Sequence, residues 1–299
     1  MDVRWNSTYL MLERFLEIKT AVILFLSDSS ISIDDPPNLD DWKVAEKLVE
    51  VLQPLYGMTN DLSAEKQVTI SLVIPMTRVL LLTYETDEDE FGVAARLKLE
   101  LFKSIKKRLG ETVEDNKIYA VSTLLDPRFK HKAFFTGNAK VENAKKFVKI
   151  EAFKIGLLKE PEENGEEESL EPPKKKSKDP WSLWDSKVKS MKKEKNKPAV
   201  DIIDAELEKF LSDPILDRSD DPLTWWNSLG QTTYPNLYQI FMKVMIVPAS
   251  SVPSERLFSK AGIVLNYLRN RLDPKVLNMI LCLNKNLSID DFQKLLSLE

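Results

Sequence analysis

The stretch Leu39–Leu55 reads LDDWKVAEKLVEVLQPL, and it decides the fold class of this chain. Its apolar residues recur every three or four positions, as they do along one face of an α-helix: Trp42, Ala45, Leu48, Val49, Leu52 and Leu55. The carboxylates of Asp40 and Asp41 stand where negative charge favours the start of a helix. The segment therefore predicts an amphipathic helix whose apolar side packs into a core.

The same helical spacing recurs on both sides of this segment. Helices are expected over residues 5–26, 70–84, 90–109, 118–135 (interrupted before Pro127), 201–211, 223–229, 234–247, 250–265, 275–286 and 289–298. Gly110 is suited to end the helix expected over residues 90–109. Because no run of alternating apolar and polar residues typical of strands is found, the fold class is predicted to be mainly α-helical.

Composition excludes several classes of protein. The 299 residues include one cysteine, Cys282, and one histidine, His131, so no zinc finger or HExxH metal site can be built and no metal site is predicted. The 8 glycines stand too far apart for a dinucleotide or P-loop phosphate signature. No segment approaches the roughly 18 apolar residues that span a bilayer, so no membrane partner is expected. His131, between Lys130 and Lys132, is expected to be a loop residue.

A charged segment divides the chain into three parts. Residues 158–199 begin with glutamates and continue with lysines, a composition that favours a disordered linker. Within it, PPKKKSK at residues 172–178 resembles a short nuclear-import signal through Lys174, Lys175, Lys176 and Lys178. The alternative is that these lysines are only a hydrated charged segment and have no role in nuclear import. The predicted location is the nucleus, in a reducing compartment.

Several motifs in a fixed order carry a resemblance. The C-terminal hundred residues contain DPLTWW (221–226), YPNL (234–237), VPASSVPSERLFSKAG (247–262) and RNRLDP (269–274), and earlier in the chain stand RWNSTY (4–9) and STLLDPRF (122–129). This ordered set resembles hAT-family transposases and their domesticated BED-finger relatives. The resemblance implies a helical insertion domain at residues 1–157, the linker, and a C-terminal dimerisation region at residues 200–299. It further implies that the tail end of an RNase H-like α/β core is present.

The resemblance also implies roles for three residues. Glu255, in the Ser-Glu-Arg motif, matches the third metal-binding carboxylate of the family, and Ser254 is suited to cap the helix that holds it. The alternative is that Glu255 is only a glutamate at a helix start. Trp5 matches an aromatic ring that stacks on a flipped DNA base, with Arg4 placed for a phosphate. The alternative for Trp5 is packing in the core.

The departures from the family pattern favour a protein that is not an enzyme. Two-metal DNA strand transfer needs several converging carboxylates, and the two catalytic aspartates, the Cys-x-x-His motif and the BED finger of the family are not found in these 299 residues. No cofactor is therefore expected, since magnesium would be held only by an intact family member. The competing hypothesis is that the chain is the C-terminal part of a longer, active hAT transposase.

The leading hypothesis is a transposase-derived dimerisation or interaction module. Its predicted contact residues are aromatic and aliphatic: Trp225, Trp226, Tyr234, Leu237, Phe241, Leu257, Phe258 and Leu281. The alternative places each of them in the core of a monomer. The expected partner is a second copy or a related transposase-derived protein. DNA is a further expected partner, bound weakly and in a salt-dependent way through Lys174–Lys178 and Lys187–Lys197.

Overall fold

The computed structural model describes residues 5–28, 33–85, 92–110, 112–157, 199–265 and 272–287. These residues form helices and no strand, which confirms the mainly α-helical prediction. The helices are α1 (Trp5–Glu17), α2 (Lys19–Leu26), α3 (Leu39–Leu62), α4 (Val73–Thr83), α5 (Val93–Ile105), α6 (Lys117–Leu125), α7 (Asn138–Lys154), α9 (Ala199–Ser212), α10 (Pro222–Trp225), α11 (Gln231–Thr233), α12 (Pro235–Met245), α13 (Val252–Val264) and α14 (Pro274–Asn286). Short 3-10 turns (Ile70–Leu72 and Lys130–Ala133) and π-helical turns (Lys106–Gly110 and Trp226–Gly230) extend or join them. No helix in these ranges is long and apolar enough to cross a membrane.

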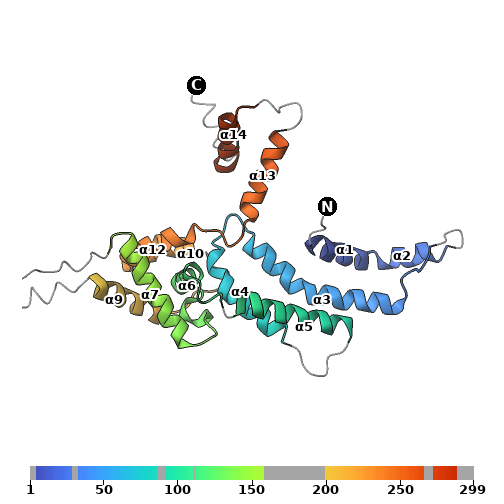
Figure 1. Cartoon of the computed structure of the whole chain (residues 1–299), viewed down its shortest axis with the longest axis horizontal. Helices are drawn as coiled ribbons and strands as arrows, with labels where there is room; N and C mark the ends of the chain where they lie inside the picture. The colour runs from blue at the N-terminus through green and yellow to red at the C-terminus, as the bar shows by residue number, and fades with distance from the viewer. Residues whose placement is uncertain are drawn as a thin grey trace, which may run out of the picture.

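The helices form three groups (Figure 1). α1 and α5 lie along the long helix α3, which also contacts α4. A second group gathers α6, α7, α9 and α12, and α4 contacts both this group and the first. The third group is a hairpin of α13 and α14 that projects away from the other two.

The first group of helices depends on aromatic stacking and on one well-formed helix cap. Asn38 Oδ1 accepts hydrogen bonds from the backbone N–H groups of Asp40 (2.8 Å) and Asp41 (3.1 Å), and Asp41 accepts one from Asn38 N. This reciprocal cap starts α3 where the sequence predicted a helix. The ring of Trp42, the one fully buried residue of α3, stacks on Phe15 at 4.6 Å between centroids. Aromatic contact therefore joins α1 to α3.

Two details of the predicted helices are wrong. The helix expected over residues 5–26 is divided at Ile18, and none of the α2 side chains is buried. Helix α7 was not expected at all. Its buried residues are only Ala144, Val148 and Ala152, small side chains spaced four apart. Such a narrow stripe does not produce the wide apolar face by which an amphipathic helix is identified in a sequence.

The segments on either side of the charged linker share one hydrophobic core. Its buried members come from Val68 to Ala152 and again from Ile203 to Met245. The linker predicted at residues 158–199 therefore divides the chain in sequence, but the helices before and after it pack into one core. The physical reason is that α6, at the centre of this group, contacts both α7 before the linker and α12 after it. The core is continuous because neither segment covers α6 alone.

The segment between α6 and α7 holds the two sides of this core together. α6 ends at Leu125, just before Pro127, as predicted. Trp226 Nε1 donates to the Leu125 carbonyl (3.1 Å), and Leu216 N donates to the carbonyl of Pro127 (3.0 Å). These contacts join the STLLDPRF motif directly to the C-terminal part of the chain.

Two buried charged side chains stabilise the same junction. Asp126 accepts hydrogen bonds from Ser71 Oγ (2.6 Å) and from the Arg128 guanidinium (2.7 Å). The Lys130 ammonium donates to the carbonyls of Phe210 (2.6 Å) and Asp213 (2.8 Å), at the end of α9. Burial lowers the pKa of Lys130, and the nearby Asp213 carboxylate opposes that shift. Each buried charge is thus supplied with partners, as a stable interior requires.

Candidate functional site

Half of the predicted dimerisation residues lie inside the monomer. Trp226, Tyr234, Leu237 and Phe241 are each 0% exposed, and Trp225 is half-buried beside them. The Trp226 ring stacks on Phe241 at 4.8 Å and meets Trp225 edge-on at 5.1 Å. These side chains therefore build the core of one chain, as the alternative expectation had placed them.

Gly230 packs directly against the ring of Trp226. A Cβ atom added at Gly230 would stand 2.3 Å from Trp226 Cε3, well inside van der Waals contact. The Tyr234 hydroxyl donates to the Asp213 carboxylate, and burial together with that contact raises the pKa of Tyr234. Polar and apolar atoms of this cluster are thus already satisfied within the chain.

The α13–α14 hairpin differs from the cluster because it buries nothing completely. Neither helix has a single buried residue. Leu257 of α13 and Leu281 of α14 are half-buried, and the two helices contact one another. The hairpin is therefore held together by partly covered apolar side chains, which two isolated helices cannot bury further.

The remaining apolar side chains of the hairpin face solvent. Phe258 is 73% exposed and Met279 is 61% exposed. Val276, Met279, Ile280 and Leu283 follow the spacing of one helix face, and all four are exposed. Together with Phe258 and Ile263 of α13, they are the exposed apolar side chains of a projecting element, here called the hairpin face. Apolar surface gathered in this way marks an interaction site more often than scattered exposed residues do.

Polar contacts fix the base of the hairpin to the end of α3. Arg256 Nη1 donates to the Ser63 carbonyl (2.6 Å), and Ser250 Oγ donates to the Leu62 carbonyl (3.1 Å). Glu65 forms ion pairs with Arg256 (3.4 Å) and with Lys285 of α14. The hydrogen bond from Lys285 is the main cause of a lowered pKa at Glu65, and burial opposes it. The hairpin is thus anchored at its base while its outer face stays open.

Glu255 lies in the first turn of α13, as predicted, with its side chain exposed. The residue before the helix is Ser251 rather than Ser254, so the predicted cap at Ser254 is wrong. Ser251 Oγ donates to Glu255 Oε1 (2.9 Å). Within the described residues, no three His, Cys, Asp or Glu side chains gather as metal ligands. Glu255 is therefore described by its helix position and its hydrogen bond, and its matched role as a metal ligand stays a prediction.

The predicted DNA contacts fall at the edge of what the structure describes. Trp5 begins α1 with 41% of its surface exposed, so it is not the core residue of the alternative expectation. Stacking of its ring on a base stays a prediction. Arg4 and the linker lysines Lys174, Lys175, Lys176 and Lys178 lie outside the described residues.

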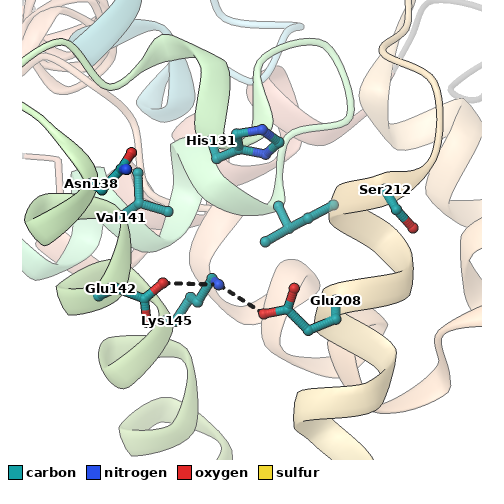
Figure 2. A pocket seen from close by; sticks show the side chains of 8 residues that line it. His131, Asn138, Val141, Glu142, Lys145, Glu208 and Ser212 are labelled. Carbon is teal, nitrogen blue, oxygen red and sulfur yellow. Dashed lines mark hydrogen bonds and ion pairs between the residues drawn. The ribbon is translucent and has the colours of Figure 1, made fainter.

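The single histidine lines an open cavity of about 380 Å³ between α7 and α9. Figure 2 shows Lys145 between Glu142 (3.0 Å) and Glu208 (2.7 Å), with His131 on the opposite side of the cavity. Burial, followed by the charges of Lys132 and Lys130, lowers the pKa of His131, so the ring is neutral at pH 7. Its Nδ1 atom is buried without a hydrogen-bond partner. The cavity thus has a neutral ring facing one lysine that is paired with two glutamates, a group with one excess negative charge, and its lining forms no nucleophile–base pair.

Comparison with known proteins defines the class of the C-terminal part. Residues 206–287 match the model described as the hAT family C-terminal dimerisation region. The match begins in α9 and ends just after α14, so it includes both the aromatic cluster and the hairpin. The C-terminal part of the chain is therefore an hAT dimerisation region.

The relatives of the chain extend this similarity over most of its length. The chain is 29% identical to the human zinc finger BED domain-containing protein 4, over 86% of this chain and 21% of the relative. It is 27% identical to the putative AC transposase of Zea mays, over 94% of this chain and 36% of that protein. It is 24% identical to the zinc finger BED domain-containing protein RICESLEEPER 3 of Oryza sativa subsp. japonica, over 94% of this chain and 38% of that protein. The resemblance to hAT transposases and BED-type proteins is confirmed, and the chain spans well under half the length of these relatives.

The hairpin face is the part of the site that sequence reasoning did not assemble. Three residues of the hairpin, Leu257, Phe258 and Leu281, were named as contact residues, but Val276, Met279, Ile280 and Leu283 were not. Their signal was present, since spacings of three, four and seven residues mark one face of a helix. A second apolar pair, Leu277 and Leu281, is interleaved with it, and only the structure tells the half-buried pair from the exposed set.

Proposed function

We propose that this chain is a dimerisation module in which the hairpin face pairs with the same face of a second copy. The observation that carries the proposal is that the matched dimerisation region includes a hairpin with no buried residue and with exposed apolar side chains on both of its helices. The other half of the region already has its partners inside the monomer. The hairpin face is thus the surface that association with a second copy would cover.

The geometry of the hairpin face suits a symmetric contact. Two copies related by a twofold axis bring the same surface together, so each exposed residue meets its counterpart or a near neighbour. Val276, Met279 and Leu283 are exposed along one side of α14, where a second helix can pack. Covering a large apolar side chain contributes about 1.5 to 3 kcal/mol before the costs of association. Several such side chains on each copy therefore favour association.

The test is the mass of the protein in solution after charge is placed on the hairpin face. Phe258→Asp with Met279→Asp puts two carboxylates into the proposed contact, where they would be desolvated without partners. We expect the unaltered chain to have twice its 34.4 kDa mass by light scattering and the double variant to have the monomer mass.

The matched control changes two equally exposed apolar residues elsewhere. Leu24→Asp with Leu82→Asp adds the same charge on α2 and α4, where the native side chains are 67% and 62% exposed. This control should keep the dimer mass. A monomer mass for the unaltered chain at every concentration, or equal behaviour of both double variants, would refute the proposed contact.

We further propose that these 299 residues do not by themselves carry out two-metal DNA strand transfer. Support comes from the position of Glu255, which lies exposed at the base of a projecting helix. The competing hypothesis, an active transposase of which this chain is the C-terminal part, is supported by the greater length of the relatives. Incubation of the purified chain with duplex DNA and magnesium should yield no cleavage. Cleavage that is lost in Glu255→Gln would contradict this proposal.

The remaining expectations of the sequence extend this proposed function. A nuclear location rests on the import-like lysines at residues 174–178, and weak DNA association rests on the linker lysines. The RNase H-like core rests on the resemblance alone, since the described residues are helical. Each stays a prediction of the sequence.

A further inference from the structure

Three lysines from three helices converge on one carboxylate, that of Glu151. Lys117 begins α6, Lys154 ends α7 and Lys243 lies in the last turn of α12. Their ammonium groups stand 2.6, 3.2 and 3.4 Å, respectively, from the carboxylate of Glu151. Because the helices come from both sides of the charged linker, only the tertiary fold assembles this group.

The charges of this group do not balance. Burial would raise the pKa of Glu151, but hydrogen bonds from Lys117 and Lys154 outweigh it and leave the pKa below its usual range. The hydrogen bond to Glu151 raises the pKa of Lys154. At neutral pH one carboxylate therefore faces three ammonium groups, and about two positive charges are left over.

The same residues line an open cavity of about 540 Å³, here called the lysine cavity. Its other walls are mainly apolar: Ile118, Val121, Val244 and Val247, with Asn116 beside them. A cavity of this size holds an organic molecule rather than a bare inorganic anion. An anionic group bound by the lysines would leave room for an uncharged part against the apolar wall.

The lysines, rather than the start of α6, supply the positive end of the cavity. Asn116 Oδ1 already accepts the hydrogen bonds of the Ile118 and Tyr119 amides (3.0 and 3.3 Å), so the first turn of α6 has little left to donate. Lys154 and Lys243 have side chains 55% and 45% exposed, and they can reach a ligand from solvent. Residues 106–154 hold twelve basic and six acidic residues, in a chain whose net charge is -4. The lining of the cavity itself has three lysines and one glutamate, so its local charge is positive.

We propose that the lysine cavity binds a phosphate ester, with the phosphate on Lys117, Lys154 and Lys243 and the organic part against the apolar wall. A nucleotide has this chemistry, either free or as a unit of a DNA strand. The inference does not depend on dimerisation, because the hairpin contributes no residue to the cavity. The two proposals therefore fail separately.

The experiment measures binding of three probes to the full chain. They are inorganic phosphate, adenosine monophosphate and a fluorescent oligonucleotide, the last followed by anisotropy at several salt concentrations. The variant is Lys154→Gln with Lys243→Gln, which removes the two exposed ammonium groups and leaves the Lys117–Glu151 pair intact. Its control is Lys43→Gln with Lys103→Gln, two exposed lysines of α3 and α5 with the same change in charge.

We expect the cavity variant to bind the nucleotide or the oligonucleotide at least tenfold more weakly than the control does. For the oligonucleotide, the slope of log K against log salt should become shallower by about two, one for each lysine that no longer neutralises a phosphate. Binding of the monophosphate without the oligonucleotide would identify a free nucleotide as the ligand, and competition between them would identify the strand. Equal weakening in both variants, or binding of inorganic phosphate alone, would overturn the proposal. Unchanged thermal unfolding of both variants verifies that each is folded.

Discussion

The two halves of the dimerisation region use apolar residues in opposite ways. In the first half, α9 to α12, the side chains of Trp226, Tyr234 and Phe241 are completely buried in a core shared with α6 and α7. In the second half, α13 and α14 bury no residue and present Phe258 and Met279 to solvent. The halves lie next to each other in sequence, but only one of them is already covered.

This difference shows why aromatic content is a poor guide to an interface. Paired tryptophans are enriched at contacts between proteins, and they are equally suited to a core that needs large side chains. The choice depends on whether other elements of the same chain cover them. Trp226 is covered because α6 supplies the Leu125 carbonyl for its indole N–H and α12 supplies Phe241 for its ring.

The comparison is tested most strongly by removing one aromatic ring from each half. Trp226→Ala should lower the free energy of unfolding by about 3 to 5 kcal/mol, because it opens a cavity and leaves the Leu125 carbonyl without its donor. Phe258→Ala should change monomer stability by no more than about 0.5 kcal/mol, because that ring is exposed. Urea unfolding at low protein concentration measures both values.

The opposite ranking would break the comparison. If Trp226→Ala left the chain folded and monomeric while Phe258→Ala unfolded it, the aromatic cluster would be the interface and the hairpin part of the core. The measurement must be made where the unaltered chain is monomeric, since dimerisation would add to the apparent stability of the hairpin.

A smaller effect is expected at the base of the hairpin. Glu65→Gln removes the carboxylate that pairs with Arg256 and Lys285, so α14 should move more freely relative to α3. Because the folded pKa of Glu65 is lowered, its contribution is present above about pH 4.5 and is lost as the pH falls through the folded pKa. A spin label on Cys282, the one cysteine of the chain and an exposed one, reports this mobility.

At pH 7 the label should be more mobile in Glu65→Gln than in the unaltered chain, and the two should converge in acid. Glu100→Gln is the matched control, because Glu100 pairs with Lys103 on the exposed surface of α5, away from the hairpin. A label equally mobile in all three proteins at pH 7 would show that the ion pairs do not anchor the hairpin.

Much of the fold could be predicted from the sequence because helix boundaries are local. The reciprocal cap at Asn38, the break before Pro127 and the prolines at the first turns of α12 and α14 all act within a few residues. Helix α7 was missed because its buried stripe consists of small residues. The break at Ile18 was missed because the apolar periodicity continues through it.

The sequence by itself determined the helical class, the order of the motifs and the resemblance to hAT transposases and BED-type proteins. Only the tertiary structure decided which apolar residues are covered, since that depends on helices distant in the chain. It joined the segments before and after the linker in one core, left the hairpin face open and brought Lys117, Lys154 and Lys243 around Glu151. Local spacing sets which face of a helix is apolar, whereas burial and charge convergence depend on what packs against it.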